Sequence, residues 1–298
     1  MAGSDMAITN IGIVGLGNMG LGMAATLARK GFKVSGYDIS EARRATVEAQ
    51  GVGFSADLIG VLSSADALVF SLPLARDVEA VVTTPGGLLQ RRDRKVVVID
   101  TSTSDPGTTR RLAKRLAEAG HGLLDAPVSG GPSGAAEGTL TMMVGGAIDD
   151  FALAEPVLAA MSARAVHVGP SGAGNIVKLV NNLLVAAHLV TTAEAIRLSE
   201  AAGLSAKEAI AVVNTATGRS AVSEIMFPRW ILTNSFDSGF SAGLMRKDVR
   251  LALELAAASG VMLPLSAHVA EIWRDTSDRL PDGADFTRMA DYRTQGAL

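Results

Sequence analysis

The feature that most constrains the fold is a glycine-rich loop near the start of the chain. The loop comprises Gly15, Leu16, Gly17, Asn18, Met19 and Gly20. It follows the apolar run Ile11–Val14 directly and precedes a run of helix-forming residues that extends to Lys30. A strand, a G-x-G-x-x-G turn and a helix in this order are typical of dinucleotide-binding folds, because glycine permits the tight turn and lets the backbone approach a pyrophosphate. Unpaired N–H groups at the helix start would face the phosphates, so we expect these six residues to bind a dinucleotide.

An acidic residue at the end of the next predicted strand indicates which dinucleotide is bound. Asp38 ends the run Lys33–Asp38 and lies 18 residues beyond Gly20, close to the spacing of about 20 at which a carboxylate binds the ribose. This carboxylate can accept both ribose hydroxyls and would repel a 2′-phosphate, so we predict NAD in preference to NADP. Arg43 and Arg44 lie nearby, and we assign them to the exposed face of the following helix.

Composition and charge exclude several classes of protein. The chain has 298 residues, of which 48% are hydrophobic and 19% charged, enough for one large or two moderate globular cores. The net charge of −3 gives no general attraction to nucleic acid or to an anionic membrane. The absence of cysteine excludes disulfides and thiolate chemistry, and the four histidines show no ligand spacing, so we expect no metal.

No segment has the pattern of a targeting or membrane-spanning sequence. The N-terminus lacks a basic region followed by an apolar core, and we expect residues 1–7 to form a short disordered extension. The longest uncharged stretch of the C-terminal half, 179–193, is shorter than the roughly 20 residues that a membrane-spanning helix needs. We therefore expect a cytoplasmic protein.

Two hydrophobic patterns divide the chain. From residue 11 to 168, β-rich runs alternate with amphipathic helical runs, which predicts an α/β fold with a parallel, doubly wound Rossmann-type sheet. Strands are expected at 11–14, 33–37, 67–71, 96–100, 122–126, 140–144 and 165–168, and helices at 19–30, 41–50, 57–63, 75–82, 106–119 and 149–161. A long helix is then expected over 175–202, further helices at 205–215, 223–232, 244–259 and 263–274, and beyond 279 a tail, either without regular structure or with one short helix. We predict a dinucleotide-binding (Rossmann) domain over 1–170 and an all-helical substrate and dimerisation domain over 171–298, joined by the long helix.

Polar loops follow several predicted strands, at the edge where a parallel sheet binds its ligands. Ser71–Leu74 and Asp100–Thr103 follow two strands; they either cover the nicotinamide half of a dinucleotide or are ordinary connections. Ser129, Gly130 and Gly131 follow a third strand, and a hydroxyl beside two glycine N–H groups forms a concavity suited to a carboxylate. A plain turn is the alternative for these three residues.

One lysine and one asparagine stand out in the apolar start of the long helix. Lys178 and Asn182 are four residues apart, so they share one helix face. A lysine in such surroundings either extends to solvent or is held in a cleft between the domains, where desolvation and a neighbouring nicotinamide cation would favour the neutral amine. In a cleft, Lys178 suits proton transfer, and Asn182 can hydrogen-bond the same reacting oxygen.

Four stretches together resemble the β-hydroxyacid dehydrogenases, the family of 3-hydroxyisobutyrate dehydrogenase and tartronate semialdehyde reductase. They are GLGNMG at 15–20, DAPVSGG at 125–131, GAGNIVKLVNN at 172–182 and GLMRKD at 243–248. The resemblance covers nearly the whole chain, and its second and third stretches are far more specific than a glycine loop. It implies reversible hydride transfer between NAD and a short β-hydroxyacid similar to 3-hydroxyisobutyrate.

The resemblance also implies roles for individual residues. Catalysis would fall to Lys178 as general acid/base and to Asn182, which would orient the substrate. The substrate carboxylate would be bound by Ser129, Gly130 and Gly131, and Asn182 would be a further substrate contact. The cofactor would be contacted by Leu72, Pro73, Thr103 and Lys247, besides the glycine loop and Asp38. Lys247 matches a lysine that reaches the active-site cleft in the family, with Asp248 behind it.

The sequence departs from the family where several relatives have an aromatic residue in the substrate pocket. Here the chain has Ala216-Thr217-Gly218-Arg219-Ser220-Ala221. We hypothesise that Arg219 or Ser220 contacts a longer or more polar substrate, as in a reductase of tartronate semialdehyde or of a threonate-like sugar acid. The alternative is an exposed arginine in a helix–helix loop.

Other functions on the same architecture remain open at this point. An imine reductase commonly lacks the lysine at position 178, and a 6-phosphogluconate-type decarboxylase needs several basic residues around a phosphate. A non-catalytic NAD-binding protein needs neither Lys178 nor Ser129. The apolar helical half predicts a homodimer or homotetramer, and we expect a small hydroxyacid as ligand, with no nucleic acid or membrane partner.

Overall fold

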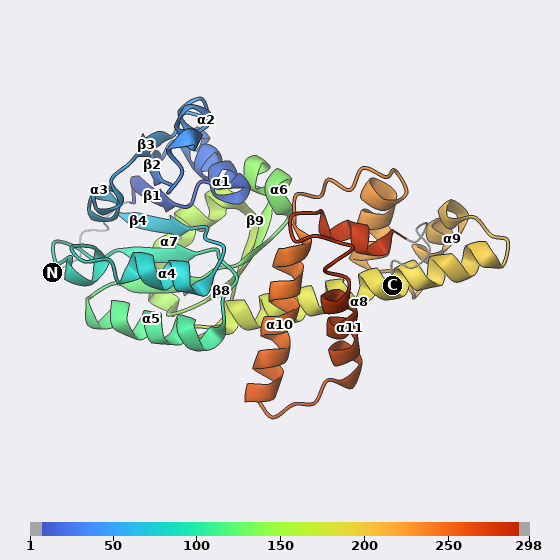
Figure 1. Cartoon of the computed structure of the whole chain (residues 1–298). Coiled ribbons are helices and arrows are strands. Elements are labelled where there is room, and N and C mark those ends of the chain that lie inside the picture. Colours follow the sequence, from blue (N-terminus) through green and yellow to red (C-terminus); the bar gives the residue numbers. More distant parts are fainter. Residues whose placement is uncertain (1–7, 292–298) are drawn as a thin grey trace. The chain divides into compact units, whose positions relative to one another are not determined.

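The computed structural model describes residues 8–291, so the extension expected over 1–7 lies outside the described residues. The chain divides into two compact units, Met1–Lys178 and Leu179–Leu298. The division falls inside α8 (Ala173–Ala201), which is the long helix expected from the sequence. Strands and helices alternate in the first unit, and helices make up the second (Figure 1).

A mixed β-sheet forms the centre of the first unit. Its strands are β1 (Asn10–Val14), β2 (Lys33–Tyr37), β3 (Gly53–Ser55), β4 (Ala67–Phe70), β5 (Val97–Asp100), β6 (Gly122–Asp125), β7 (Val128–Ser129), β8 (Leu140–Gly145) and β9 (Ser162–Gly169). Along the sheet the order is β3-β2-β1-β4-β5-β6-β8-β7, and β9 pairs with β8. All pairs from β3 to β6 are parallel, so the carboxyl ends of β1, β4, β5 and β6 meet at one edge.

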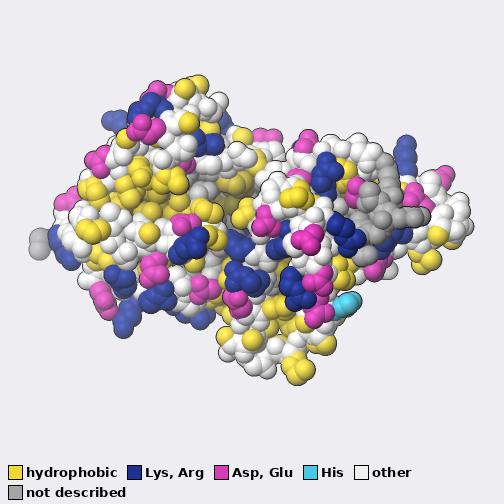
Figure 2. Space-filling view, in the orientation of Figure 1, with side chains coloured by type: hydrophobic (Ala, Val, Ile, Leu, Met, Phe, Trp, Pro, Cys, Tyr) yellow, Lys and Arg dark blue, Asp and Glu magenta, His cyan; other side chains and the backbone are white. Residues whose placement is uncertain are grey.

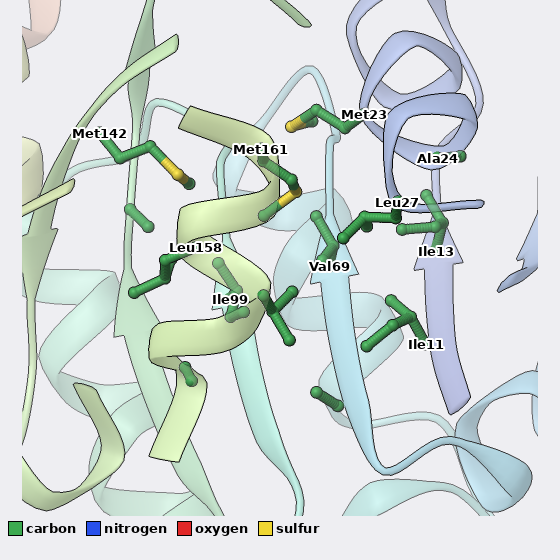
Figure 3. Close-up of a cluster of buried hydrophobic side chains, with 14 of the residues drawn as sticks. Ile11, Ile13, Met23, Ala24, Leu27, Val69, Ile99, Met142, Leu158 and Met161 are labelled. Carbon is green, nitrogen blue, oxygen red and sulfur yellow. The ribbon is translucent and has the colours of Figure 1, made fainter. Parts of the chain in front are cut away.

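Helices cover both faces of this sheet, which confirms the doubly wound α/β prediction. On one face, α1 (Asn18–Arg29) and α7 (Ile148–Met161) pack on side chains such as Ile11 and Val69 (Figure 3). On the other face, α3 (Leu58–Ser64), α4 (Ala75–Val82) and α5 (Pro106–Glu118) pack on Leu68 and Phe70. Successive residues of β4 therefore enter opposite cores, as the two-residue repeat of a strand requires.

The sheet is not parallel throughout. The expectation of a wholly parallel sheet was wrong for the strands beyond β6. Strand β8 runs antiparallel to both β6 and β7. The connection from β6 to β8 contains β7 and the short helix α6 (Gly131–Glu137), which reverse the chain before β8 enters the sheet. The strands β3 and β7 and the helix α6 were not expected. The helix expected over 41–50 is a 3₁₀ turn, η1 (Glu41–Arg43), followed by α2 (Arg44–Glu48), and η2 (Leu88–Gln90) is a further 3₁₀ turn.

The second unit is a helical body around its own core. After α8 come α9 (Ala206–Val213), η3 (Val222–Ile231), α10 (Ala242–Ala258), α11 (Pro264–Asp275) and η4 (Phe286–Ala290). The η3 segment is a π-helix, and Pro228 within it lacks the N–H that an α-helical ladder needs. Phe286 and Met289 are buried in the same core as Trp273, so the segment expected as a tail is packed as far as the structure describes it, up to residue 291. Helix α8 is long and apolar enough to cross a membrane, but length and composition alone do not distinguish such a helix from the core helix of a globular protein.

Candidate functional site

The glycine loop makes a tight connection between β1 and α1. Gly15 has a φ of 91°, and a Cβ at this residue would lie 2.3 Å from the carbonyl oxygen of Ser71. A Cβ on Gly20 would lie 1.9 Å from the carbonyl oxygen of Gly15, so neither position tolerates a side chain. Gly17, by contrast, faces open space at the start of α1. The loop holds the helix close to the strand and leaves the backbone at Gly17 accessible to a pyrophosphate, which fits a dinucleotide.

The remaining loop residues differ in what they expose. Asn18 is exposed and Met19 is half-buried, so both can contact a ligand. The side chain of Leu16 is fully buried, and its N–H donates to Oδ2 of Asp38 at 2.8 Å. Leu16 therefore anchors the loop through its buried side chain and its hydrogen bond to Asp38, and its side chain is not available to a ligand.

The carboxylate of Asp38 is fixed by backbone groups at the end of β2. Besides the Leu16 N–H on Oδ2, its Oδ1 accepts the N–H of Ser40 at 2.9 Å. A carboxylate has about four acceptor positions, so capacity remains for ribose hydroxyls. Arg43 and Arg44, expected on an exposed face, are half-buried, and the Arg44 guanidinium carbon lies 4.5 Å from the ring centroid of Phe54.

The structure brings together the two polar loops that follow β4 and β5. These strands are neighbours in the sheet, and Leu72, Pro73 and Thr103 lie in the loops after them. The N–H of Leu72 donates to Oγ of Ser102 at 2.9 Å, and the N–H of Ser102 donates to Oδ1 of Asp100 at 3.0 Å. Ser102 belongs to the stretch Asp100–Thr103 singled out from the sequence but was given no individual role, and it joins the two loops at this edge of the sheet.

Ser129, Gly130 and Gly131 connect β7 to α6. Gly130 has a φ of 127° and Gly131 a φ of 64°, conformations that favour glycine. Gly130 is exposed, whereas Ser129 and Gly131 are half-buried. Two consecutive glycines with positive φ next to the Ser129 hydroxyl fit the concavity expected for a carboxylate.

Lys178 extends toward this loop and not to solvent. Its side chain is buried, with 9% of the residue exposed, and Nζ donates to the carbonyl oxygen of Val128 at 2.8 Å. Val128 precedes Ser129 directly, so Nζ of Lys178 lies beside the start of the loop formed by Ser129, Gly130 and Gly131. Both belong to the first unit. The Lys178 side chain is therefore buried and does not extend to solvent.

Two buried side chains that the sequence did not single out hold the start of α8. Asp125 has 0% exposure, and its carboxylate accepts the N–H of Gly172 at 2.8 Å and that of Asn175 at 2.9 Å. Desolvation by burial raises the pKa of Asp125 despite these hydrogen bonds. The Asn175 side chain accepts the N–H of Ser104 at 2.9 Å and donates to Oγ1 of Thr109 at 3.1 Å. The available signal was a polar residue in each of the two specific stretches, with Asp125 opening the first and Asn175 following Gly174 in the second.

A second polar cluster lies within the second unit. Asn182 follows Lys178 by one turn of α8, and its Nδ2 donates to Oδ2 of Asp248 at 2.6 Å. Nζ of Lys247 lies 3.4 Å from Oδ1 of the same carboxylate. Asp248 is almost completely buried, so the lysine compensates its charge and the carboxylate fixes the Asn182 amide. The structure thus brings Asn182, Lys247 and Asp248 together.

The segment that departs from the family lies between α9 and η3. Arg219 is exposed, and Oγ of Ser220 accepts the N–H of Ser223 at 3.2 Å. Ser220 is therefore used in a local turn, and Arg219 is the exposed one of the two residues expected to contact the substrate. Among residues 8–291, no three His, Asp or Glu side chains are grouped so that they could hold a metal.

Comparisons with known proteins cover both units. A family model described as the NAD binding domain of 6-phosphogluconate dehydrogenase matches residues 10–169. A second model, described as NAD-binding of NADP-dependent 3-hydroxyisobutyrate dehydrogenase, matches residues 172–293.

Individual relatives span nearly the whole chain. 2-(Hydroxymethyl)glutarate dehydrogenase of Eubacterium barkeri is 39% identical over 88% of this chain and 87% of its own. 3-Hydroxyisobutyrate dehydrogenase of Pseudomonas aeruginosa is 34% identical over 95% of this chain and 97% of its own. The solved structure of Mycobacterium tuberculosis 3-hydroxyisobutyrate dehydrogenase with L-serine has a TM-score of 0.87 and 34% identity, and the match covers 95% of this chain and 98% of that one.

Proposed function

Because the chain belongs to the β-hydroxyacid dehydrogenase family and is an NAD-linked dehydrogenase acting on CH–OH groups, we propose that Lys178 is its general acid/base in the reversible oxidation of a β-hydroxyacid. The observation that carries the proposal is the hydrogen bond of 2.8 Å from Nζ of Lys178 to the carbonyl oxygen of Val128. This bond holds a proton-transferring group beside the loop of Ser129, Gly130 and Gly131.

Each group has a defined task in this proposal. The first unit holds NAD at the glycine loop and Asp38, with Leu72, Pro73 and Thr103 as further cofactor contacts. The helical unit serves the substrate and the subunit interface and adds Lys247 as a cofactor contact. The functional boundary in this proposal lies near residue 170, just before α8, whereas the compact units divide at Lys178. NAD supplies the acceptor for the hydride that leaves the carbinol carbon.

The residues of the chain itself bind the acid and move the proton. Ser129, Gly130 and Gly131 bind the substrate carboxylate through a hydroxyl and backbone N–H groups. Nζ of Lys178 takes the hydroxyl proton during oxidation and returns it during reduction, a contribution of about 10² to 10⁴ in rate. Asn182, held by Asp248, orients the reacting oxygen.

Replacement of Lys178 tests this assignment. We expect Lys178→Ala to lose about 10²-fold or more in kcat, because no other acid or base takes over the proton. NAD affinity is expected to stay unchanged, because the glycine loop and Asp38 are untouched. Turnover is followed at 340 nm and NAD binding by titration, with Lys207→Ala on the exposed face of α9 as the matched control. A Lys178→Ala enzyme with near wild-type kcat would refute the mechanism.

Two observations favour a substrate with a second polar end. The relative with 39% identity is named for 2-(hydroxymethyl)glutarate, a hydroxyacid with two carboxylates, and Arg219 is exposed in the segment where the family places an aromatic residue. An arginine guanidinium pairs well with a carboxylate. We therefore place the distal carboxylate of such a substrate on Arg219.

A panel of hydroxyacids distinguishes the two substrate classes. We expect Arg219→Ala to lower kcat/KM about tenfold for 2-(hydroxymethyl)glutarate, equivalent to about 1.4 kcal/mol. The same variant should leave 3-hydroxyisobutyrate oxidation nearly unchanged, because that substrate has no distal charge. Equal effects on both substrates would speak against the role of Arg219.

For the protein in its cell we propose a cytoplasmic location.

A further inference from the structure

Two helices link the glycine loop at 15–20, here the cofactor loop, to the loop of Ser129, Gly130 and Gly131, here the carboxylate loop. Helix α1 starts at the glycine loop, α6 starts at Gly131, and the two helices pack against each other. Gly22 of α1 faces α6, and a Cβ at this position would lie 3.0 Å from Cβ of Ala135. Glycine here lets the helices approach closely.

The end of α6 is hydrogen-bonded to side chains of α1. Oγ1 of Thr26 lies 2.9 Å from the carbonyl oxygen of Ala135 and 3.0 Å from that of Ala136. Arg29 donates to Oγ1 of Thr26 at 2.7 Å and also to the carbonyl oxygen of Ala136. The last carbonyls of a helix have no partner within that helix. Since Thr26 is only 1% exposed, water cannot readily replace its hydroxyl.

The short helix α6 depends on these contacts for its position. It has seven residues, whereas isolated helices shorter than about 12 residues are marginal in water. Its first residue, Gly131, belongs to the carboxylate loop, so a shift of α6 moves that loop. The start of α1, by contrast, is fixed to β1 through the close contact between Gly20 and Gly15.

We propose that Thr26 is a positioning residue that fixes the carboxylate loop relative to the cofactor loop. This inference rests on the proposed function, because it assigns the hydroxyacid carboxylate to Ser129, Gly130 and Gly131. The Thr26 side chain contacts α6, and through α6 it sets where the hydroxyacid lies against the cofactor held at the other end of α1. Loss of its hydroxyl therefore weakens hydroxyacid binding and leaves NAD binding intact.

Two substitutions at Thr26 separate positioning from folding. Thr26→Val removes the hydroxyl at constant volume, and we expect it to raise KM for the hydroxyacid about tenfold. Thr26→Ser keeps the hydroxyl and should stay within about twofold of the wild type. The Kd for NAD, measured by titration without hydroxyacid, should be the same in all three proteins. Thr84→Val is the matched control, because its exposed hydroxyl donates to the carbonyl oxygen of Ala80 at 2.8 Å away from both loops.

Hydrogen–deuterium exchange gives a readout that does not require turnover. We expect amides of α6 to exchange faster in Thr26→Val than in the wild type or in Thr26→Ser, with those of α7 unchanged. Gly22→Ala adds a methyl group between α1 and α6 without removing a polar group. It should give the same combination of a raised KM for the hydroxyacid and an unchanged affinity for NAD.

Several outcomes would overturn the inference. They are an unchanged KM in Thr26→Val, equal damage in the Val and Ser variants, a parallel loss of NAD affinity, or unchanged exchange across α6. A wild-type enzyme that oxidises no hydroxyacid would instead contradict the proposed function, and the exchange data would then decide the role of Thr26.

Discussion

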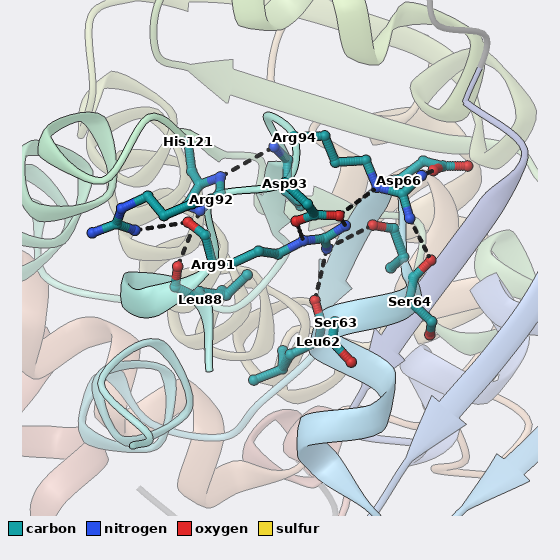
Figure 4. A network of polar contacts seen from close by, with 12 residues as sticks. Leu62, Ser63, Ser64, Asp66, Leu88, Arg91, Arg92, Asp93, Arg94 and His121 are labelled. Carbon is teal, nitrogen blue, oxygen red and sulfur yellow. Dashed lines mark hydrogen bonds and ion pairs between the residues drawn. The ribbon is translucent and has the colours of Figure 1, made fainter. Parts of the chain in front are cut away.

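His121 lies in a buried polar network at the edge of the sheet opposite the ligand-binding ends of the strands. Its Nδ1 accepts the N–H of Val96 at 3.2 Å, and its Nε2 lies 3.0 Å from the carbonyl oxygen of Leu88. This arrangement requires a neutral ring with the proton on Nε2. Burial lowers the pKa of His121 below its usual 6.5, and the charges of Arg91 and Arg92 add to this effect (Figure 4).

The lowered pKa makes stability depend on pH near neutrality. Because the folded protein binds a proton at His121 less readily than the unfolded chain, the stabilisation is fully present above pH 6.5 and is lost as the pH falls below it. Asp93, whose pKa Arg91 lowers to about 2, stays ionised in this range. The raised pKa of Asp125 has the opposite effect, because it makes the protein less stable as the pH rises. The contribution of His121 is therefore measured by comparing the wild type with a variant that lacks this histidine.

We therefore expect the thermal midpoint of the wild type to fall between pH 7.5 and pH 5.5 more steeply than that of His121→Gln. Glutamine keeps a donor and an acceptor but does not titrate. Calorimetry at several pH values measures the difference, and His268→Gln, at an exposed histidine, is the control. Parallel pH profiles of wild type and His121→Gln would contradict this prediction.

At the scale of elements, long segments with a clear hydrophobic period were predictable from the sequence. The strand at 33–37 and the helix at 75–82 were expected at their observed bounds. The pattern that predicts them is local, because it is the two-residue or 3.6-residue period of apolar side chains within one short segment of the chain. The glycine loop was predictable for the same reason, since a fixed spacing carries its geometry.

Short elements were not predictable, because tertiary contacts stabilise them. α6 contains Gly131, Pro132 and Gly134 and has no helical period; it forms against α1, where Thr26 completes its hydrogen bonds. β7 has two residues and exists through pairing with β8. The site has the same limit: Lys178 could be picked out by family resemblance, but its partner is a backbone carbonyl that no side-chain pattern reveals.

At the scale of the molecule, the second unit exposes several large apolar side chains. Val180 is 50% exposed and Leu184 is 52% exposed, and these residues lie one turn apart on α8. Met262 and Leu265 are exposed around the turn between α10 and α11, where Figure 2 shows apolar side chains at the tip. Exposed apolar groups of this kind mark interfaces, which supports the expectation of a homodimer or homotetramer.

Sedimentation velocity tests this expectation directly. We expect the wild type to sediment at a multiple of its monomer mass of 30.6 kDa. A Val180→Glu, Leu184→Glu double variant should shift toward the monomer, because two carboxylates on one face of α8 would be buried without partners in an interface. Leu153→Glu, at an exposed leucine on α7 of the first unit, controls for added charge. A wild type that sediments as a monomer at micromolar concentration would rule out the oligomer, and the apolar face of α8 would then need another explanation.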